Sequence, residues 1–122
     1  MARHNSIGQW GEKIAQNYLS EKGYAILETN WRRHRDEVDI IAYNRGEIVF
    51  VEVKTRTSTE YGRPESFVDR KKQQAYIRMA NTYMRFYNRD ERVRFDIIAI
   101  VVDPQSGAHQ IDHLEDAYST AY

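Results

Sequence analysis

Three residues in the middle of the chain, Asp39, Glu52 and Lys54, have the types and spacing of a metal-assisted hydrolytic site. Glu52 and Lys54 end the apolar run 48–51, and residues two apart in a strand point to the same face. A hard cation such as Mg²⁺ prefers oxygen ligands and commonly uses one or two carboxylates while keeping several waters. Bound here, it would polarise a phosphate and lower the pKa of a bound water, and Lys54 would offset charge on the phosphate oxygens. The three residues therefore indicate hydrolysis of a phosphodiester.

Two neighbouring strands must position these residues. Residues 38–43 and the apolar run before Glu52 both have strand character, and Asn44-Arg45-Gly46 between them is typical of a hairpin turn. Such a turn places Asp39 opposite residue 51 or 52, where like charges destabilise a hairpin. Two carboxylates in an apolar hairpin therefore call for a cation between them, and the main-chain carbonyl of Val53 is a natural third ligand. The non-catalytic alternative is that Glu52 and Lys54 form a solvated ion pair on an exposed strand.

The composition is typical of a folded protein, and its net charge does not favour nucleic-acid binding. The chain has 122 residues, 18 basic and 18 acidic side chains, and no cysteine. We expect one domain, residues 1–122, and the lack of cysteine excludes disulfides and thiolate metal sites. Because the net charge is zero, any nucleic-acid binding must come from local basic patches. The first residues lack an apolar signal segment, so we expect a cytoplasmic protein without a membrane partner.

The remaining elements follow from hydrophobic periodicity. An amphipathic helix is predicted from Ser6 to about residue 23, with Glu12 at the flank of its apolar stripe. We also predict a strand over 24–27, a polar loop over 55–64, a helix from about 69 to 87, a buried strand over 93–102 and a short edge strand over 109–114. This order predicts an α/β fold with a mixed sheet covered by at least two helices.

These motifs carry a family resemblance. The chain resembles the PD-(D/E)xK nuclease superfamily, through Asp39 followed after thirteen residues by Glu52-Val53-Lys54. More narrowly, it is similar to the YraN-like bacterial family and to the archaeal Holliday-junction resolvases. The matching segments are Gly8-Gln9-Trp10-Gly11-Glu12, Glu37-Val38-Asp39-Ile40-Ile41-Ala42, Val49-Phe50-Val51-Glu52-Val53-Lys54-Thr55-Arg56 and Arg94-Phe95-Asp96. One position departs from the pattern, because residue 36 is Asp where we expect Gly.

The resemblance implies a fold and a set of roles. The fold would be a restriction-endonuclease-like α-β-β-β-α-β core. Asp39 and Glu52 would be metal ligands for Mg²⁺ or Mn²⁺, Lys54 the catalytic lysine, and Glu12 an auxiliary acid near the metal, although Glu12 could equally face solvent. The cations that we predict to contact nucleic acid are Arg32, Arg33, Arg35, Arg56, Lys71 and Lys72.

Each secondary feature also has a plainer interpretation. The run Arg32 to Arg35 could hold phosphates, with the neighbouring Trp31 available for stacking, or it could be a solvated loop. Lys71 and Lys72 could face a substrate groove or form a plain helix surface. Glu37 is expected in a salt bridge and Asp96 as a structural hydrogen-bond acceptor. The tyrosines at helical spacing, Tyr76, Tyr83 and Tyr87, are expected in the core or at a dimer surface instead of forming base platforms.

Three functions remain open from the sequence. The first is a metal-dependent nuclease acting on DNA, with branched structures among the candidate substrates. The second is a catalytically inactive nucleic-acid-binding module in DNA processing, and the third is an interaction protein with a relic fold. Resolvase-like chemistry would favour a homodimer, because a junction presents two strands to be cut.

Overall fold

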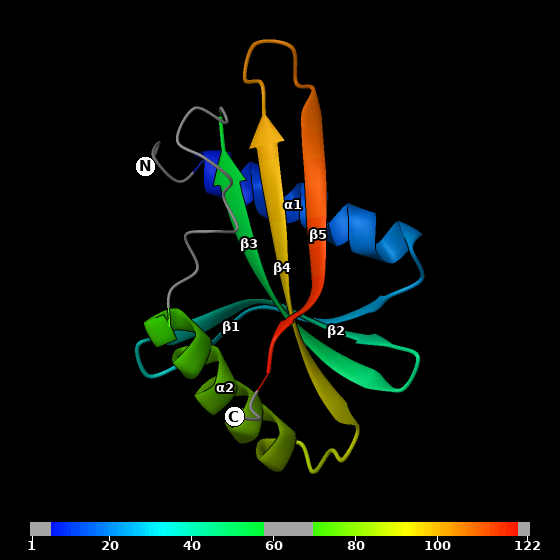
Figure 1. The fold of residues 1–122 in the computed structure, drawn as a ribbon, viewed down its shortest axis with the longest axis vertical. Helices are drawn as coiled ribbons and strands as arrows, with labels where there is room; N and C mark the ends of the chain where they lie inside the picture. The colour runs from blue at the N-terminus through cyan, green and yellow to red at the C-terminus, as the bar shows by residue number, and fades with distance from the viewer. Residues whose placement is uncertain (1–5, 58–69, 120–122) are drawn as a thin grey trace.

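A five-stranded mixed sheet organises the chain (Figure 1). The computed structural model describes residues 6–57 and 70–119. Within these residues the sheet order is β1-β2-β3-β4-β5, and only the β3–β4 pair is parallel. The elements are α1 (Ser6–Glu21), β1 (Ala25–Arg33), β2 (Asp36–Asn44), β3 (Glu47–Arg56), α2 (Arg70–Phe86), β4 (Arg92–Val102) and β5 (His109–Tyr118). The predicted α-β-β-β-α-β order of a restriction-endonuclease-like core is confirmed, and β5 extends it.

The two helices bury opposite faces of this sheet. Residues of α1, including Ala15 and Leu19, pack with Ile40, Val51 and Ile98 in one core cluster. Residues of α2 form a second cluster on the other face, whose members from the sheet are Val38, Ile41, Ile48, Phe50 and Phe95. Figure 1 shows α1 behind β3, β4 and β5, with α2 beside the opposite end of the sheet. A site at the middle of β2 and β3 can therefore be reached by side chains from both helices.

The hairpin between β2 and β3 has the predicted turn and register. Arg45 and Gly46 have φ values of 51° and 84°, as a two-residue turn that follows the sheet twist requires. The pairing runs from Asn44 opposite Glu47 to Ile40 opposite Val51. The next position in this register brings Asp39 beside Glu52.

One glycine sets how closely α1 approaches the sheet. A Cβ atom on Gly11 would meet the Oγ1, Cγ2 and Cβ atoms of Thr55 in β3, so only glycine fits there without a shift. Gly11 is buried, and Glu12 follows it directly. The close contact between α1 and β3 thus places Glu12 near the middle of the sheet.

The structure corrects the prediction that the arginine run forms a loop. Trp31, Arg32 and Arg33 continue β1 and pair with Val38, Glu37 and Asp36. Since β1 is an edge strand, its exposed side chains can be cationic without cost to the core. The last strand is also longer than predicted, because β5 extends to Tyr118.

Two further predictions concern the segment between β3 and α2. Thr55 and Arg56 belong to β3 instead of the predicted polar loop, and positions 58–64 of that loop lie outside the described residues. The predicted start of the second helix at Asp69 lies outside them as well. Within residues 6–57 and 70–119, neither helix has the length and apolar character needed to cross a bilayer.

Candidate metal and phosphate site

Asp39 and Glu52 meet where the pairing of β2 with β3 ends. The carboxylate of Asp39 reaches across to β3, and its Oδ2 accepts a hydrogen bond from the main-chain N–H of Val53 at 2.8 Å. The core changes side at this point of β2, because Val38 packs in the α2 cluster whereas Ile40 packs in the α1 cluster. The regular alternation of side chains between the two faces therefore changes around Asp39, where the two acids lie.

Glu52 is a buried carboxylate with unequal surroundings at its two oxygens. Only 2% of the residue is exposed. Its Oε2 atom lies 3.4 Å from Lys54 Nζ and 3.6 Å from Lys72 Nζ. Its Oε1 atom is buried and has no hydrogen-bond partner among the described residues. A buried carboxylate oxygen without a partner is costly, so Oε1 is an atom that a bound cation or donor would stabilise.

Asp39 carries the electrostatic signature of an acidic cluster. The pKa of its carboxyl group is raised from 3.8 to about 7, chiefly by burial and then by the charges of Glu12, Glu52 and Glu37, against the opposing hydrogen bond from Val53. A carboxyl with a raised pKa is one that resists ionisation in the absence of a cation. The site therefore favours the arrival of positive charge.

Asn30 holds the two outer acids of this cluster. Its Nδ2 donates to Glu12 Oε1 at 3.1 Å and to Glu37 Oε2 at 2.6 Å. Asn30 adopts a positive φ of 51°, which asparagine tolerates better than most residues, and lies in β1 near Asp39 of β2. Glu37 also forms the predicted salt bridge, with Arg32 at 3.2 Å. The structure thus brings Glu12 toward Asp39 but ties its carboxylate to Asn30.

Tyr76 of α2 fixes the backbone of the site. Its hydroxyl accepts a hydrogen bond from the main-chain N–H of Asp39 at 3.1 Å and donates to the carbonyl of Val51 at 3.4 Å. Tyr76 is buried in the α2 cluster, as predicted, so its ring and hydroxyl have separate roles. This second role has no sequence signal beyond a tyrosine at a core position where phenylalanine would pack equally well.

A second buried hydroxyl lies close to Glu52. The ring of Tyr118 stacks on Phe95 with centroids 5.0 Å apart, and its hydroxyl has no partner among the described residues. Burial raises the pKa of Tyr118, and the charge of Glu52 adds to that effect. The C-terminal strand therefore contributes a polar atom to the surroundings of Glu52, which the sequence did not predict.

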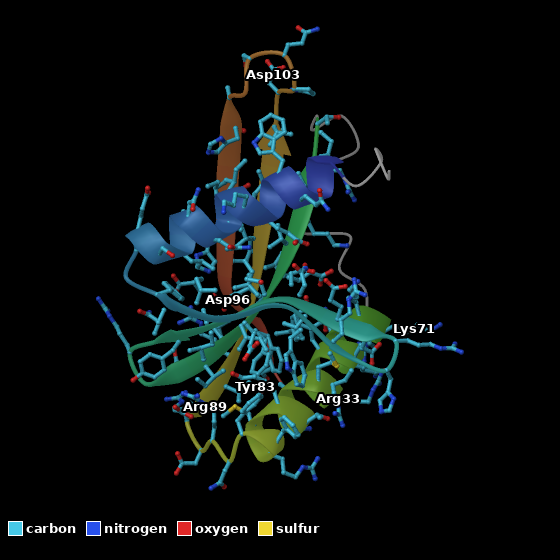
Figure 2. The ribbon with its side chains drawn as sticks, turned by 180° about the vertical axis from the view of Figure 1, so that it is seen from behind. Arg33, Lys71, Tyr83, Arg89, Asp96 and Asp103 are labelled. Atoms are coloured by element: carbon cyan, nitrogen blue, oxygen red, sulfur yellow. The ribbon has the colours of Figure 1, made fainter. Side chains whose placement is uncertain are left out.

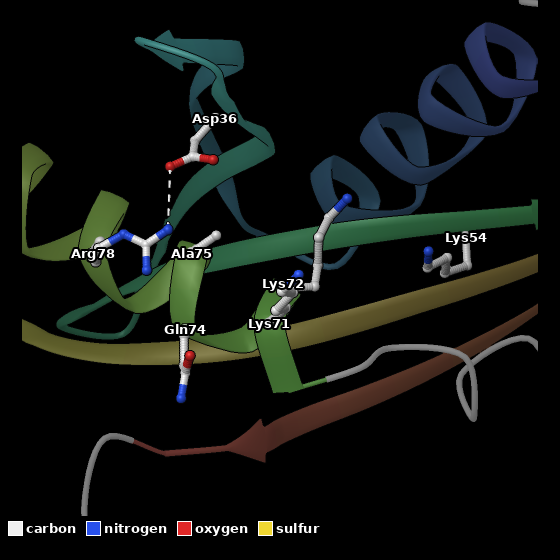
Figure 3. Close-up of a pocket in the computed structure, with 7 residues that line it drawn as sticks. All are labelled: Asp36, Lys54, Lys71, Lys72, Gln74, Ala75 and Arg78. Atoms are coloured by element: carbon white, nitrogen blue, oxygen red, sulfur yellow. Dashed lines mark ion pairs between the residues drawn. The ribbon is translucent and has the colours of Figure 1, made fainter.

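A cationic groove of about 570 Å³ adjoins the acids (Figure 3). Its lining includes Lys54, Lys71 and Lys72, and an ion pair of 3.6 Å between Asp36 and Arg78 lies at its other end. Of the two interpretations given for Lys71 and Lys72, a substrate groove or a plain helix surface, both stay predictions, and both lysines line this groove. Asp36, which stands where glycine was expected, is the first residue of β2 and lies at this end of the groove.

A smaller cavity connects that groove to Asp39. Its volume is about 290 Å³, and it is lined by Arg35, Asp36, Glu37, Asp39, Lys72, Ala75 and Tyr76. Asp36, Lys72 and Ala75 line both spaces, so the two lie next to each other near the start of α2. Arg35 is thereby brought to the site with the lysines.

The other predicted cations lie further out. Arg32 is engaged by Glu37, and Arg33 stands over the ring of Phe86, 5.8 Å from its centroid. Arg56 lies two residues beyond Lys54 on β3, and its Nη1 donates to the carbonyl of Thr55 at 3.3 Å. Trp31, expected to be available for stacking, is partly buried, and its indole packs edge-on against Tyr83 beside the α2 cluster.

The Arg94-Phe95-Asp96 motif builds a separate, structural network. Asp96 is fully buried and accepts two hydrogen bonds from Arg94, at 2.9 and 2.8 Å, and the amide of Asp116 at 3.0 Å. Its Oδ2 lies 2.7 Å from His113 Nε2, and Tyr18 contacts the other ring nitrogen at 3.0 Å. Burial acts most strongly and upward on the pKa of Asp96, but the hydrogen bonds from His113 and Arg94 outweigh it and hold that pKa below its usual value. The interpretation of Asp96 as a structural acceptor is confirmed.

The donor set for a metal is small. Across residues 6–57 and 70–119, three or more acidic or histidine side chains do not converge as a metal-binding group. A cation at this site would therefore be held by the carboxylates of Asp39 and Glu52, the Val53 carbonyl and water, a set that suits Mg²⁺ better than a fully enclosed metal. The unpartnered Oε1 of Glu52 and the raised pKa of Asp39 both fit such a cation.

Fold and site together define an α/β protein with a restriction-endonuclease-like core, in which paired acids and a lysine open into a cationic groove. The chain belongs to the family described as "Uncharacterised protein family UPF0102", whose model matches residues 11–100. It is 42% identical over 118 residues to the UPF0102 protein FP2501 of Flavobacterium psychrophilum, covering 97% of this chain and 98% of the relative. It is 43% identical over 118 residues to a UPF0102 protein of Bacteroides thetaiotaomicron, covering 97% and 96% of the two chains.

Proposed function

We propose that this protein is a divalent-metal-dependent nuclease of the PD-(D/E)xK superfamily, which hydrolyses phosphodiester bonds in DNA, with branched structures among its candidate substrates. One observation carries the proposal. Glu52, the buried neighbour of Asp39 in the hairpin, has an Oε1 atom without a partner among the described residues, while its Oε2 atom faces Lys54 and Lys72 at a cationic groove. Paired acids that need a cation, next to a groove that suits phosphates, match the requirements of phosphodiester hydrolysis.

The chain's own residues would divide the work. Asp39, Glu52 and the Val53 carbonyl would hold Mg²⁺ or Mn²⁺, which when bound polarises the phosphate and lowers the pKa of the attacking water. Lys54, 3.4 Å from Glu52, is placed to orient that water or to offset charge on the phosphate oxygens. Tyr76 would keep the two strands in register through its hydrogen bonds to Asp39 and Val51.

The bond changes are those of a hydrolysis. The water oxygen forms a bond to phosphorus, the bond from phosphorus to one bridging oxygen breaks, and the leaving oxygen takes up a proton. The products are one strand end with a phosphate and one with a hydroxyl group. Lys71, Lys72 and Arg35 line the groove and the adjoining cavity, where they would bind the phosphates on either side of the scissile bond.

One observation favours a second function, that of a catalytically inactive nucleic-acid-binding module. Lys54 and Lys72 both lie within 3.6 Å of Glu52 Oε2, so two ammonium groups can neutralise the carboxylate without a metal. A site balanced in this way would bind phosphates through its groove and would not cleave them.

A cleavage assay separates the two functions. Labelled single-stranded, duplex, flap and four-way-junction DNA are incubated with Mg²⁺, Mn²⁺ or EDTA and with wild type, Glu52→Gln, Lys54→Ala or the control Lys13→Ala, which removes an exposed lysine of α1. We expect metal-dependent cleavage by wild type and Lys13→Ala, and none by the two site variants. Cleavage that persists in Glu52→Gln would refute the assignment, and a wild type that binds DNA without cutting it would establish the inactive module.

A further inference from the structure

Two exposed aromatic side chains end α2, at the opposite end of the helix from the acids. Phe86 is 64% exposed and Tyr87 is 44% exposed. Their rings meet edge-on with centroids 4.9 Å apart. Tyr87 also packs on Tyr83 at 4.7 Å, and Tyr83 is anchored in the core by Phe50 at 5.7 Å. Tyr87 therefore links the pair to the core, while both rings keep a large exposed area.

Basic side chains lie beside this aromatic pair and continue along α2 toward the Asp39–Glu52 site. Arg33 of β1 lies 5.8 Å from the centroid of the Phe86 ring. The seventeen residues of α2 include five cations and no acidic side chain. Lys71, Arg78 and Arg85 recur at intervals of seven, nearly two turns, so they lie along one face of the helix. Lys71 and Arg78 belong to the lining of the groove beside Glu52.

Nearby acidic groups offset this charge only in part, although the charge of Glu28 in β1 also reaches Tyr83. Arg78 pairs with Asp36 at 3.6 Å, but both side chains are exposed, and exposed pairs of this kind are weak. Glu91, which follows the helix, is engaged by Arg89 through two hydrogen bonds of 3.1 and 2.7 Å. Figure 2 shows Lys71 near one end of α2, with Tyr83, Arg33 and Arg89 toward the other.

We propose that Phe86, Tyr87 and Arg33 form a stacking platform for unpaired bases of a nucleic-acid strand, whose phosphates follow the cations of α2 to the Asp39–Glu52 site. Aromatic rings accept any base on their faces, arginine adds a cation–π contact, and lysine and arginine bind the backbone. A second copy of the chain is a poorer occupant, because a self-complementary contact here would bring the cations of two α2 helices together.

This inference rests on the proposed function and narrows its substrate. Fourteen residues separate Lys72 from Phe86, which corresponds to about 21 Å along a helix. A strand bound at both places must therefore leave several nucleotides unpaired beside the scissile bond. Flaps and single-stranded overhangs meet this requirement, whereas a continuous duplex does not.

The test measures binding in EDTA, so that it does not depend on cleavage. Fluorescence anisotropy is recorded with a labelled single strand and a duplex of equal length, for wild type, Phe86→Ala/Tyr87→Ala and the control Tyr43→Ala, which removes an exposed tyrosine from β2. Loss of stacking should weaken single-strand binding by about 5- to 150-fold for each base released. Duplex binding and the salt dependence should stay as in wild type, because the phosphate contacts remain.

Four results would refute the stacking platform. They are no binding of a single strand by wild type, equal losses of affinity for both DNA forms, an equal loss in the control, and unchanged binding by the double variant. Sedimentation velocity adds one more, since a wild-type dimer that dissociates in the double variant would assign the surface to a second copy. Failure of the nuclease proposal looks different, because selective single-strand binding without metal-dependent cleavage would refute the nuclease and leave the platform in place.

Discussion

Replacing Asp39 with asparagine should stabilise the metal-free protein at alkaline pH while removing its response to metal. The pKa of Asp39 in the folded protein is raised from 3.8 to about 7, chiefly by burial and then by three neighbouring glutamates. Between these two values the native state binds more protons than the unfolded state, so the free energy of unfolding falls as pH rises from about 4 to about 7. Asparagine does not titrate, and its side-chain oxygen can still accept the Val53 N–H bond.

The magnitude follows from the size of the shift. One pKa unit corresponds to about 1.4 kcal/mol, so the change from 3.8 to about 7 sets a ceiling of about 4 kcal/mol. Asp39 is only partly buried, and the site can relax around its charge, so we expect a gain of roughly 2–4 kcal/mol for Asp39→Asn at pH 8. Near pH 4 both proteins carry a neutral side chain at this position, and the difference should nearly vanish.

Urea unfolding in EDTA at pH 4.5, 6 and 8 measures this difference. The matched control is Asp90→Asn, which changes an exposed aspartate and should follow the wild-type pH profile. Mn²⁺ at about one hundred times its Kd should then stabilise wild type by about 2.7 kcal/mol at pH 8 and leave Asp39→Asn unchanged. A stability difference that is the same at all three pH values would refute the reasoning about Asp39.

Other predictions concern matched pairs of residues. Tyr76→Phe should cost about 1–3 kcal/mol and reduce activity, because the buried N–H of Asp39 loses its acceptor, whereas Tyr118→Phe should be neutral or stabilising because it removes an unpartnered hydroxyl. Equal losses of stability in urea unfolding would contradict this contrast. Gly11→Ala should cost about 1–3 kcal/mol because its Cβ meets a β3 side chain, whereas Gly8→Ala, with open space around it, should gain about 0.5–1 kcal/mol. Thermal unfolding of both variants checks the order, and a stable Gly11→Ala protein would refute the close contact.

The central residues of the site were predictable because strand geometry fixes them. A two-residue turn at Arg45 and Gly46 determines the register, and the register brings Asp39 beside Glu52. Alternation along β3 then places Lys54 on the same face as Glu52. The sequence contains all the information for this step, since only local pairing is involved.

The supporting residues were not predictable for the opposite reason. Asn30 joins Glu12 and Glu37 only because β1 adopts a positive φ there, and a single asparagine gives no such signal. Tyr76 reaches Asp39 from a helix 37 residues away, which depends on how α2 crosses the sheet. These contacts belong to tertiary packing, which periodicity does not describe.

The aromatic residues illustrate the same limit. Trp31 stands beside arginines in the sequence and was predicted to be available for stacking, but strand pairing leaves it partly buried against Tyr83. Phe86 belongs to a helix and resembles a core residue by type, yet it is 64% exposed because α2 ends at this position. Which aromatic side chains reach solvent was decided by where the elements end.

The cation between Asp39 and Glu52 is the central claim, and anomalous scattering from Mn²⁺ tests it most directly. Crystals of the wild-type protein grown with Mn²⁺ at pH 8 should show one strong anomalous peak at coordination distance from Asp39 and from Glu52 Oε1, and crystals of Glu52→Gln should lack it. Well-ordered wild-type crystals with no peak there, and with Lys54 and Lys72 still paired to Glu52, would contradict the metal site and the nuclease built on it.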